Sequence, residues 1–97
     1  MSEKTYNGWK NRETWSVARW IDCTEAEQTY WRERAREERD GHFYKEGAIA
    51  LLAEDLRDTI GENSPISENN MYSDLLNCAL ANVDWREIAA HLIEGLK

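Results

Sequence analysis

Apolar residues recur along most of the chain at the three- and four-residue spacing of amphipathic helices. The first such segment covers residues 12–23, and Asn11 precedes it with a side chain that can cap a helix. A second helix is expected from Thr24, because a glutamate three residues later completes the spacing of a capping box. Between residues 32 and 40 only Ala35 is apolar, so we expect this half of the helix to project into water.

The later segments predict three more helices. One is expected over residues 43–60, with Gly61 just beyond its end, where glycine commonly terminates helices. Residues 62–70 hold the only proline among serine and asparagine residues, which indicates a loop within the domain. Two apolar stripes follow, over residues 72–83 and 85–96, and the short connection between them predicts an antiparallel helical hairpin.

Together these segments predict an all-α fold, a compact bundle of about five helices with an ordered N-terminal arm. The length of 97 residues predicts one helical domain over residues 1–97. No segment alternates between apolar and polar residues as a half-buried strand would, and no apolar run approaches the ~20 residues that span a membrane.

Charge adds an asymmetry to this picture. The chain has 19 acidic and 12 basic residues, a net charge of −7. Residues 1–23 carry four basic and three acidic residues, so the remainder carries −8, and no basic residue lies between Arg57 and Arg86. Such a surface repels bare duplex, whose binding relies on lysine and arginine, and it suits a partner with a basic surface. The alternative is that the charge only keeps the domain soluble.

No residue pattern indicates catalysis, a metal site or a cofactor. Cys23, His42, Cys78 and His91 lack the short spacings that define zinc sites, and the chain has no P-loop and no G-x-S-x-G motif. We therefore expect a protein that is not an enzyme and that has no metal and no cofactor. Two distant cysteines and the absence of a signal-peptide pattern predict a cytoplasmic protein with reduced thiols.

The acidic positions after the second helix are the first candidate binding surface. A row of carboxylates could compete for the lysine and arginine side chains of a nucleic-acid-binding protein, whereas the alternative is a solvated helix face beside a polar loop. The second helix illustrates that alternative, since its four arginines offset most of the charge of its six acidic residues. The candidate residues are Glu46, Glu54, Asp55, Asp58, Glu62, Glu68 and Asp74.

The N-terminal sequence carries a resemblance. The run from Tyr6 to Trp15 reads Y-N-G-W-K-N-R-E-T-W and is followed by V-A-R-W-I at residues 17–21. It resembles a family of short, acidic, largely uncharacterised proteins of phages, plasmids and other mobile elements, and residues 72–76 and 83–89 are similar to that family's C-terminal half. The resemblance implies a mobile-element context, in which anti-CRISPR and anti-restriction inhibitors occur, several of them DNA mimics.

The resemblance supplies no catalytic residues, and its motif has a structural interpretation. Asn11 would cap the first helix, Glu13 would favour the positive end of the helix dipole, and Trp9 and Trp15 would anchor the arm. The alternative is a binding surface made of these four residues together with Asn7.

Three functions remain open. The first is a binding protein of a phage or mobile element that blocks a nucleic-acid-handling defence complex in the host cytoplasm, with a CRISPR effector as partner and DNA mimicry as one route. The second is a small adaptor or regulator that binds a protein through exposed aromatics, of which Tyr6, Trp9 and Trp31 are the candidates. The third, direct nucleic-acid binding through the arginines of residues 32–39, is disfavoured by the acids between them. Neither a membrane nor nucleic acid is expected as a direct partner.

Overall fold

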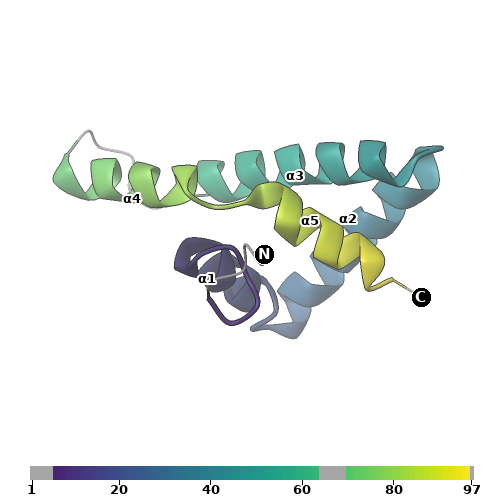
Figure 1. Cartoon of the computed structure of the whole chain (residues 1–97), viewed down its shortest axis with the longest axis horizontal. Coiled ribbons are helices and arrows are strands. Elements are labelled where there is room, and N and C mark those ends of the chain that lie inside the picture. The colour runs from purple at the N-terminus through teal and green to yellow at the C-terminus, as the bar shows by residue number, and fades with distance from the viewer. Residues whose placement is uncertain (1–5, 64–69, 97) are drawn as a thin grey trace.

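The computed structural model describes residues 6–63 and 70–96 and contains five α-helices within them, which confirms the all-α prediction (Figure 1). The helices are α1 (Arg12–Ile21), α2 (Glu25–Gly41), α3 (Lys45–Glu62), α4 (Met71–Ala81) and α5 (Trp85–Glu94).

Side-chain caps fix where four of the helices begin. Asn11, Thr24 and Asp84 each accept a hydrogen bond from a backbone N–H in the first turn of α1, α2 and α5, as their sequence positions predicted. Asn70 and Ser73 form a reciprocal capping box at the start of α4. These bonds satisfy N–H groups that have no partner within the helix.

The N-terminal arm is a tight turn. Tyr6 and Trp9 exchange backbone hydrogen bonds of 3.0 and 2.7 Å across Asn7 and Gly8, whose φ angles are 49° and 88°. A two-residue turn with both φ angles positive is the conformation that Asn-Gly favours. The Tyr6 ring then packs 5.0 Å from the Trp15 ring, and the Trp9 ring packs 5.0 Å from the His91 ring. Residues 6–10 are therefore fastened to both α1 and α5.

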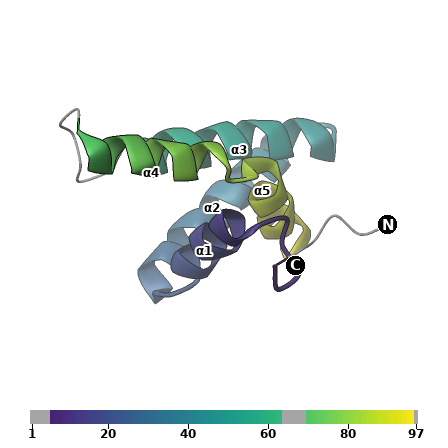
Figure 2. The ribbon, with the colours of Figure 1, turned by 60° about the vertical axis from the view of Figure 1, so that its left-hand side comes forward.

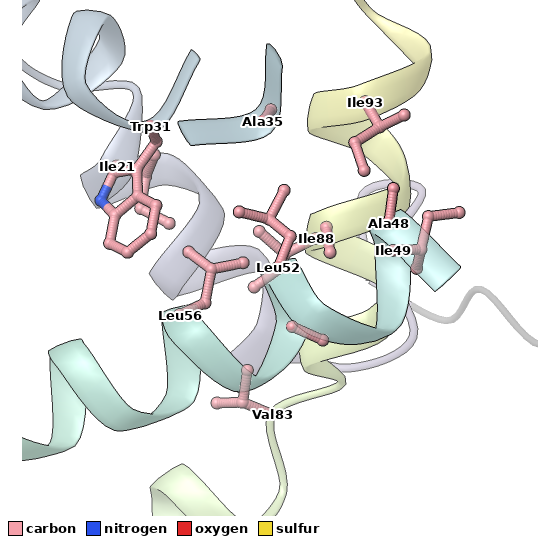
Figure 3. Packing of buried hydrophobic residues seen from close by; sticks show 12 residues of the cluster. Ile21, Trp31, Ala35, Ala48, Ile49, Leu52, Leu56, Val83, Ile88 and Ile93 are labelled. Carbon is pink, nitrogen blue, oxygen red and sulfur yellow. The ribbon is translucent and has the colours of Figure 1, made fainter. Parts of the chain in front are cut away.

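The core lies where α3 and α5 pack against each other and α2 crosses them both. Leu52, Leu56 and Ile88 are at most 2% exposed. Figure 3 shows the buried side chains converging from four helices and from Val83 in the connection before α5. The cluster consists of Ile21, Trp31, Ala35, Ala48, Ile49, Leu52, Ala53, Leu56, Val83, Ile88, Ala89 and Ile93.

The expectation that the second half of α2 projects into water is wrong. Ala35 is fully buried, and α2 packs along both α3 and α5. A single alanine suffices because its small side chain permits a close approach of the helices, while longer polar side chains on either side reach around the contact. Arg34, on the flank of this contact, bonds across to α3.

Two further expectations about the C-terminal half are also wrong. Gly61 lies inside α3 and Asn63 is the C-cap, its backbone N–H donating to the carbonyl of Thr59 at 3.1 Å. Residues 72–96 do not form a packed hairpin, because α5 turns away from α4 and packs against α1, α2 and α3. Figures 1 and 2 show α4 running antiparallel to α3 along its C-terminal part, away from the crossing of α2 and α5. No residue of α4 is buried.

Candidate partner-binding surface

Three of the predicted acidic residues form a row on the outer face of α3. Glu54, Asp58 and Glu62 follow one another at four-residue intervals, so they lie on one side of the helix about 6 Å apart along its axis. All three are exposed. The opposite side of α3 carries the buried Leu52 and Leu56. We call Glu54, Asp58 and Glu62 the acidic row.

Asp55 does not belong to the acidic row. Its carboxylate accepts a hydrogen bond from Arg34 Nε at 2.7 Å and another from the Thr59 hydroxyl at 3.2 Å. Arg34 also donates to Glu37 at 2.6 Å and to Glu38 at 3.0 Å. Desolvation alone would lower the pKa of Arg34, but hydrogen bonds to Asp55, Glu37 and Glu38 outweigh it and raise that pKa above its ordinary value. Asp55 therefore ties α3 to α2 and is already engaged in an ion pair.

The other predicted acids are dispersed. Glu46 is exposed in the first turn of α3, two helical turns before the acidic row. Asp74 is exposed in the first turn of α4. Glu68 lies outside the described residues. The structure thus brings together only three of the seven predicted acidic residues. The others lie on another turn or another helix, are paired with Arg34, or lie outside the described residues.

Cations border the acidic row on one side. Arg57 Nε lies 3.3 Å from a carboxylate oxygen of Asp58, and this exposed pair contributes little to stability. Arg57, Arg86 and Glu54 also line one shallow surface depression between α3 and the start of α5. The row is therefore a short acidic strip next to guanidinium groups rather than one edge of a uniformly acidic face.

The predicted aromatic site is mostly structural. Trp31 is 2% exposed and belongs to the core, so the expectation that its ring can reach a partner is wrong. Tyr6 and Trp9 are half-buried against Trp15 and His91. These two ring contacts hold the arm against α1 and α5.

Polar residues of the N-terminal motif join the two ends of the chain. The Asn11 side chain donates to the backbone carbonyl of Asn82 at 2.7 Å and accepts from the Thr14 hydroxyl at 2.7 Å. The Thr14 hydroxyl accepts from the backbone N–H of Asp84 at 2.8 Å and is fully buried. The backbone N–H of Lys10 donates to Glu87 at 3.0 Å. The start of α1 is thereby bonded to the start of α5, which supports the structural interpretation of the motif.

A cleft of about 360 Å³ lies beside this junction, between α1, α2 and α5. Its floor is apolar, from Ile21, Ile88 and neighbouring side chains, and indole rings form part of its wall. Arg19 stands 5.4 Å over the Trp15 ring, a cation–π contact that occupies one face of that indole. One face of the Trp15 ring is therefore already covered by a basic side chain of the same lining.

A second, more apolar groove of about 860 Å³ opens between α4 and the end of α1. Trp20, 67% exposed, stands in it opposite Leu76 and Leu80 of α4, and Ile60 of α3 also lines it. Among the described residues of the lining, Glu27 alone is charged. The lining comprises Ser16, Val17, Trp20, Ile21, Thr24, Glu27, Ile60, Asn63, Leu76 and Leu80.

The apolar surface continues beyond this groove along α4. Met71, Tyr72 and Leu75 are each at least 60% exposed. From the sequence, the apolar stripe of α4 was expected to pack against the next helix. Apolar periodicity shows that a helix face is apolar, but it does not show whether another helix covers that face. The spacing alone offered no signal for this exposure. Exposed apolar patches of this kind mark interaction sites in soluble proteins.

The described residues contain no cluster of three or more His, Cys, Asp or Glu side chains that could hold a metal ion. Cys23 and Cys78 are exposed and unpaired with each other. None of the described helices combines the length and apolar character needed to cross a membrane.

The fold and surface define a small all-α domain whose described residues combine an acidic helix face with an open apolar groove. The chain belongs to a family of unknown function (DUF7249), whose sequence model matches residues 2–94. The match spans all five helices and both halves of the polar junction between α1 and α5. No curated protein and no solved structure matches the chain.

Proposed function

We propose that this protein is a non-enzymatic binding protein that docks its α3–α4 side on a basic surface of a partner protein. The acidic row carries the proposal, because it presents three exposed carboxylates at regular spacing on a rigid helix. The sequence from residue 58 to residue 85 contains five acidic residues, three of them outside the acidic row, and no basic one. Complementary charge of this kind accelerates association and selects basic partners.

The partner we propose is a nucleic-acid-handling defence complex of a host cell, such as a CRISPR effector, inhibited in the cytoplasm by a protein of a phage or mobile element. Small size, net charge −7 and the resemblance of the N-terminal motif support this assignment. Inhibition would come from occupying a few lysine or arginine side chains that otherwise hold phosphates. With Asp55 paired with Arg34 and Arg57 beside Asp58, the acidic row imitates a short stretch of phosphates, not a whole duplex.

The test replaces the acidic row with neutral isosteres, Glu54→Gln, Asp58→Asn and Glu62→Gln together. A matched control neutralises three exposed acids elsewhere, Glu33→Gln, Asp40→Asn and Glu94→Gln, so that net charge changes equally. Asp55 stays unchanged in both, because its loss would disturb the contact with α2.

The tagged wild-type chain is used to capture its partner from nuclease-treated host lysate, and the affinity of the purified pair is measured at about 50 and 300 mM salt. We expect the row variant to bind at least tenfold more weakly at low salt, and its binding to depend less on salt. Release of DNA from the captured complex by the wild-type chain would support inhibition. Equal loss in row and control variants, or salt-independent binding, would overturn the proposal.

A second function, that of an adaptor binding through exposed aromatics, is favoured by different residues from those predicted. Trp20 and Tyr72 are 67% and 64% exposed, whereas Trp31 is buried. This function requires Trp20→Ala with Tyr72→Ala to abolish partner capture while the row variant retains it. Acrylamide quenching gives a first check, because Trp20→Phe should remove most of the quenchable fluorescence.

A further inference from the structure

The cleft between α1, α2 and α5 combines basic side chains with an apolar floor. Trp15, Arg19 and Asp22 are four and three residues apart, so α1 and its C-cap present them on one side. Arg32 of α2 and His91 of α5 also line the cleft. We infer that this cleft binds a nucleoside monophosphate, with the base on the apolar floor and the phosphate between the two arginines. The site is separate from the acidic row and does not depend on the proposed function.

Both arginines of the cleft have donors available for an anion. Arg19 and Arg32 are exposed, and within the described residues neither guanidinium forms an ion pair or a hydrogen bond. Arg34 and Arg57, in contrast, each hold a carboxylate oxygen within 3.3 Å. A guanidinium carries its N–H donors in one plane, which matches the oxygens of a phosphate. The contact of Arg19 with the Trp15 ring also limits its conformations before a ligand arrives, which lowers the entropic cost of binding.

The charge of the lining favours an anion. Among the described lining residues, Arg19 and Arg32 are basic and Asp22 is acidic, so the cleft carries a net charge of +1 with His91 counted as neutral. A partly enclosed cleft with apolar walls concentrates such a potential. A quaternary ammonium group would suit the indole rings, but it would meet the two arginines, which disfavour a cation.

Neighbouring charges on α1 and α2 act in the same direction. Arg12 lies seven residues before Arg19, so it is on the same side of α1. On α2, Glu25 lies seven residues before Arg32 and Arg36 lies four residues after it, so all three share one side. Arg12, Glu25 and Arg36 are exposed. With the lining they give four arginines against two acids, a local charge of +2 in a chain whose net charge is −7.

The acidic residues of α5 near the cleft are engaged elsewhere. Glu87 lies four residues before His91 and accepts a hydrogen bond from the backbone N–H of Lys10 at 3.0 Å. Glu94 lies three residues after His91, and its carboxylate is 3.4 Å from Lys45 Nζ. Both carboxylates line a neighbouring depression together with Lys10, not the cleft itself. They therefore leave the positive charge of the lining uncancelled.

The size and the apolar floor of the cleft suit one base. Its volume of about 360 Å³ lies within the range of small-molecule sites, roughly 300–1,000 Å³. Ile21 and Ile88 in the floor are at most 6% exposed, so they are fixed by the core. Trp9 and Trp15 are half-buried, which leaves part of each indole for contact with a flat ring. Every base has such a face and can stack on an aromatic side chain.

Two arginines favour a phosphate over a carboxylate as the anionic group. A phosphate monoester carries a charge of about −1.5 to −2 at pH 7 and has three terminal oxygens, which suffices for Arg19 and Arg32 together. A carboxylate carries a single charge on two oxygens. A long polynucleotide is disfavoured, because the net charge of −7 repels its further phosphates. These features together specify a single nucleotide.

The test measures binding by calorimetry at about 50 mM NaCl. The four common nucleoside monophosphates are compared with their nucleosides, which lack the phosphate, with inorganic phosphate, which lacks the base, and with naphthoate, a flat carboxylate. We expect at least one nucleotide to bind at least tenfold more tightly than every reference probe. In NMR spectra the indole N–H signals of Trp9 and Trp15 should shift on binding, whereas that of Trp85, outside the cleft, should not.

Arginine variants locate the phosphate. Arg19→Gln and Arg32→Gln each remove one guanidinium from the cleft. Arg86→Gln is the matched control, because Arg86 is also exposed and has no ion pair among the described residues, but it lies outside the cleft. Each cleft variant should lose at least tenfold in affinity for the nucleotide and less than threefold for the nucleoside. Arg86→Gln should change both less than twofold, and circular dichroism checks every fold.

Asp22→Asn gives a result that misfolding cannot imitate. The change removes the acidic side chain that opposes the phosphate, and the Asp22 side chain is exposed, so the fold should be retained. We expect the affinity for the nucleotide to rise at least fourfold. Asp58→Asn removes an acidic charge on α3, outside the cleft, and should change the affinity less than twofold.

Several results would overturn the inference. A nucleotide that binds no more tightly than its nucleoside or inorganic phosphate would show that the cleft does not join a base site to a phosphate site. Tighter binding of naphthoate would assign the cleft to an aromatic carboxylate instead. An equal loss in Arg86→Gln and the cleft variants would mean that overall charge, not this cleft, attracts the anion. Capture of a protein by the acidic row is measured separately, so failure of either site leaves the other standing.

Discussion

At the scale of single residues, the buried hydroxyl of Thr14 links the start of α1 to the start of α5. This hydroxyl accepts from the backbone N–H of Asp84 and donates to Asn11, which itself bonds to the backbone of Asn82. The change Thr14→Val keeps the shape and removes both bonds. We expect a loss of ~2 kcal/mol in the free energy of unfolding, measured by urea denaturation, because the N–H of Asp84 is left without this acceptor.

Thr29→Val is the matched control for that change. Thr29 is also on a helix but is exposed, so the same substitution should alter stability by less than about 0.5 kcal/mol. If both variants lose stability equally, the junction between α1 and α5 does not depend on this hydroxyl.

Asp55 has a structural role, unlike the neighbouring carboxylates of the acidic row. Asp55→Asn should destabilise the fold by ~1–2 kcal/mol, because the charged hydrogen bond from Arg34 links α2 to α3. Asp58→Asn, whose pair with Arg57 is exposed, should change stability by less than about 0.5 kcal/mol. Urea denaturation of the two variants under one condition compares them directly. Equal losses of stability in the two variants would mean that the bond between Arg34 and Asp55 contributes no more to stability than the exposed pair of Arg57 and Asp58.

Roles that depend only on neighbouring residues were predictable from the sequence. Asn11, Thr24 and Asp84 cap helices as predicted, because a cap depends only on the next three residues. The ion pair between Asp55 and Arg34 was not predictable, since Arg34 is 21 residues away and reaches Asp55 only after α2 packs on α3. The hydrogen bond from the backbone N–H of Asp84 to the Thr14 hydroxyl spans 70 residues and was unpredictable for the same reason.

At the scale of helices, equivalent apolar stripes have different roles. Leu52 of α3 is fully buried, whereas Leu75 of α4 is 60% exposed. Leu52→Ala should therefore cost ~3 kcal/mol in the free energy of unfolding, through lost burial and a cavity, and Leu75→Ala less than about 0.5 kcal/mol. Thermal or urea denaturation checks both. A loss above ~2 kcal/mol for Leu75→Ala would show that α4 is covered in the free protein.

Periodicity predicted that helices exist but not which helices pack together. The stripe of α4 resembles that of α5, yet α5 packs on three helices and α4 has no buried residue. Conversely, residues 32–40 of α2 looked too polar to pack, yet Ala35 is fully buried in the core. Helix pairing depends on which faces meet across long sequence separations, and local spacing does not contain that information.

At the scale of the molecule, α3 and α4 form an extension from the crossing of α2, α3 and α5. The radius of gyration is 13.9 Å, against about 12.5 Å for a compact chain of this length. The longest extent of 42 Å lies along α3 and α4 in Figure 1. Asp58, Glu62 and α4 therefore lie beyond Leu56, the last buried residue of α3, where substitutions change the surface without removing a buried side chain.

The net charge of −7 leads to a final prediction about the whole molecule. Repulsion among excess carboxylates destabilises the compact state, and salt screens it, so the free energy of unfolding should rise between about 0.05 and 0.5 M NaCl. The acidic row contains two like-charge contacts at four-residue spacing, whose neutralisation should stabilise the protein by on the order of 0.5 kcal/mol at low salt.

Urea denaturation at both salt concentrations tests this, with the wild type compared with the variant carrying Glu54→Gln, Asp58→Asn and Glu62→Gln. That variant has a net charge of −7 + 3 = −4 and should show a smaller rise with salt. Screening of the Arg34 ion pairs acts in the opposite direction, but the Arg34 and Asp55 side chains are only 26% exposed, which limits that loss. A wild type that becomes less stable with salt would mean that ion pairs outweigh repulsion. The acidic row would then be balanced by neighbouring cations instead of being held ready for a basic partner.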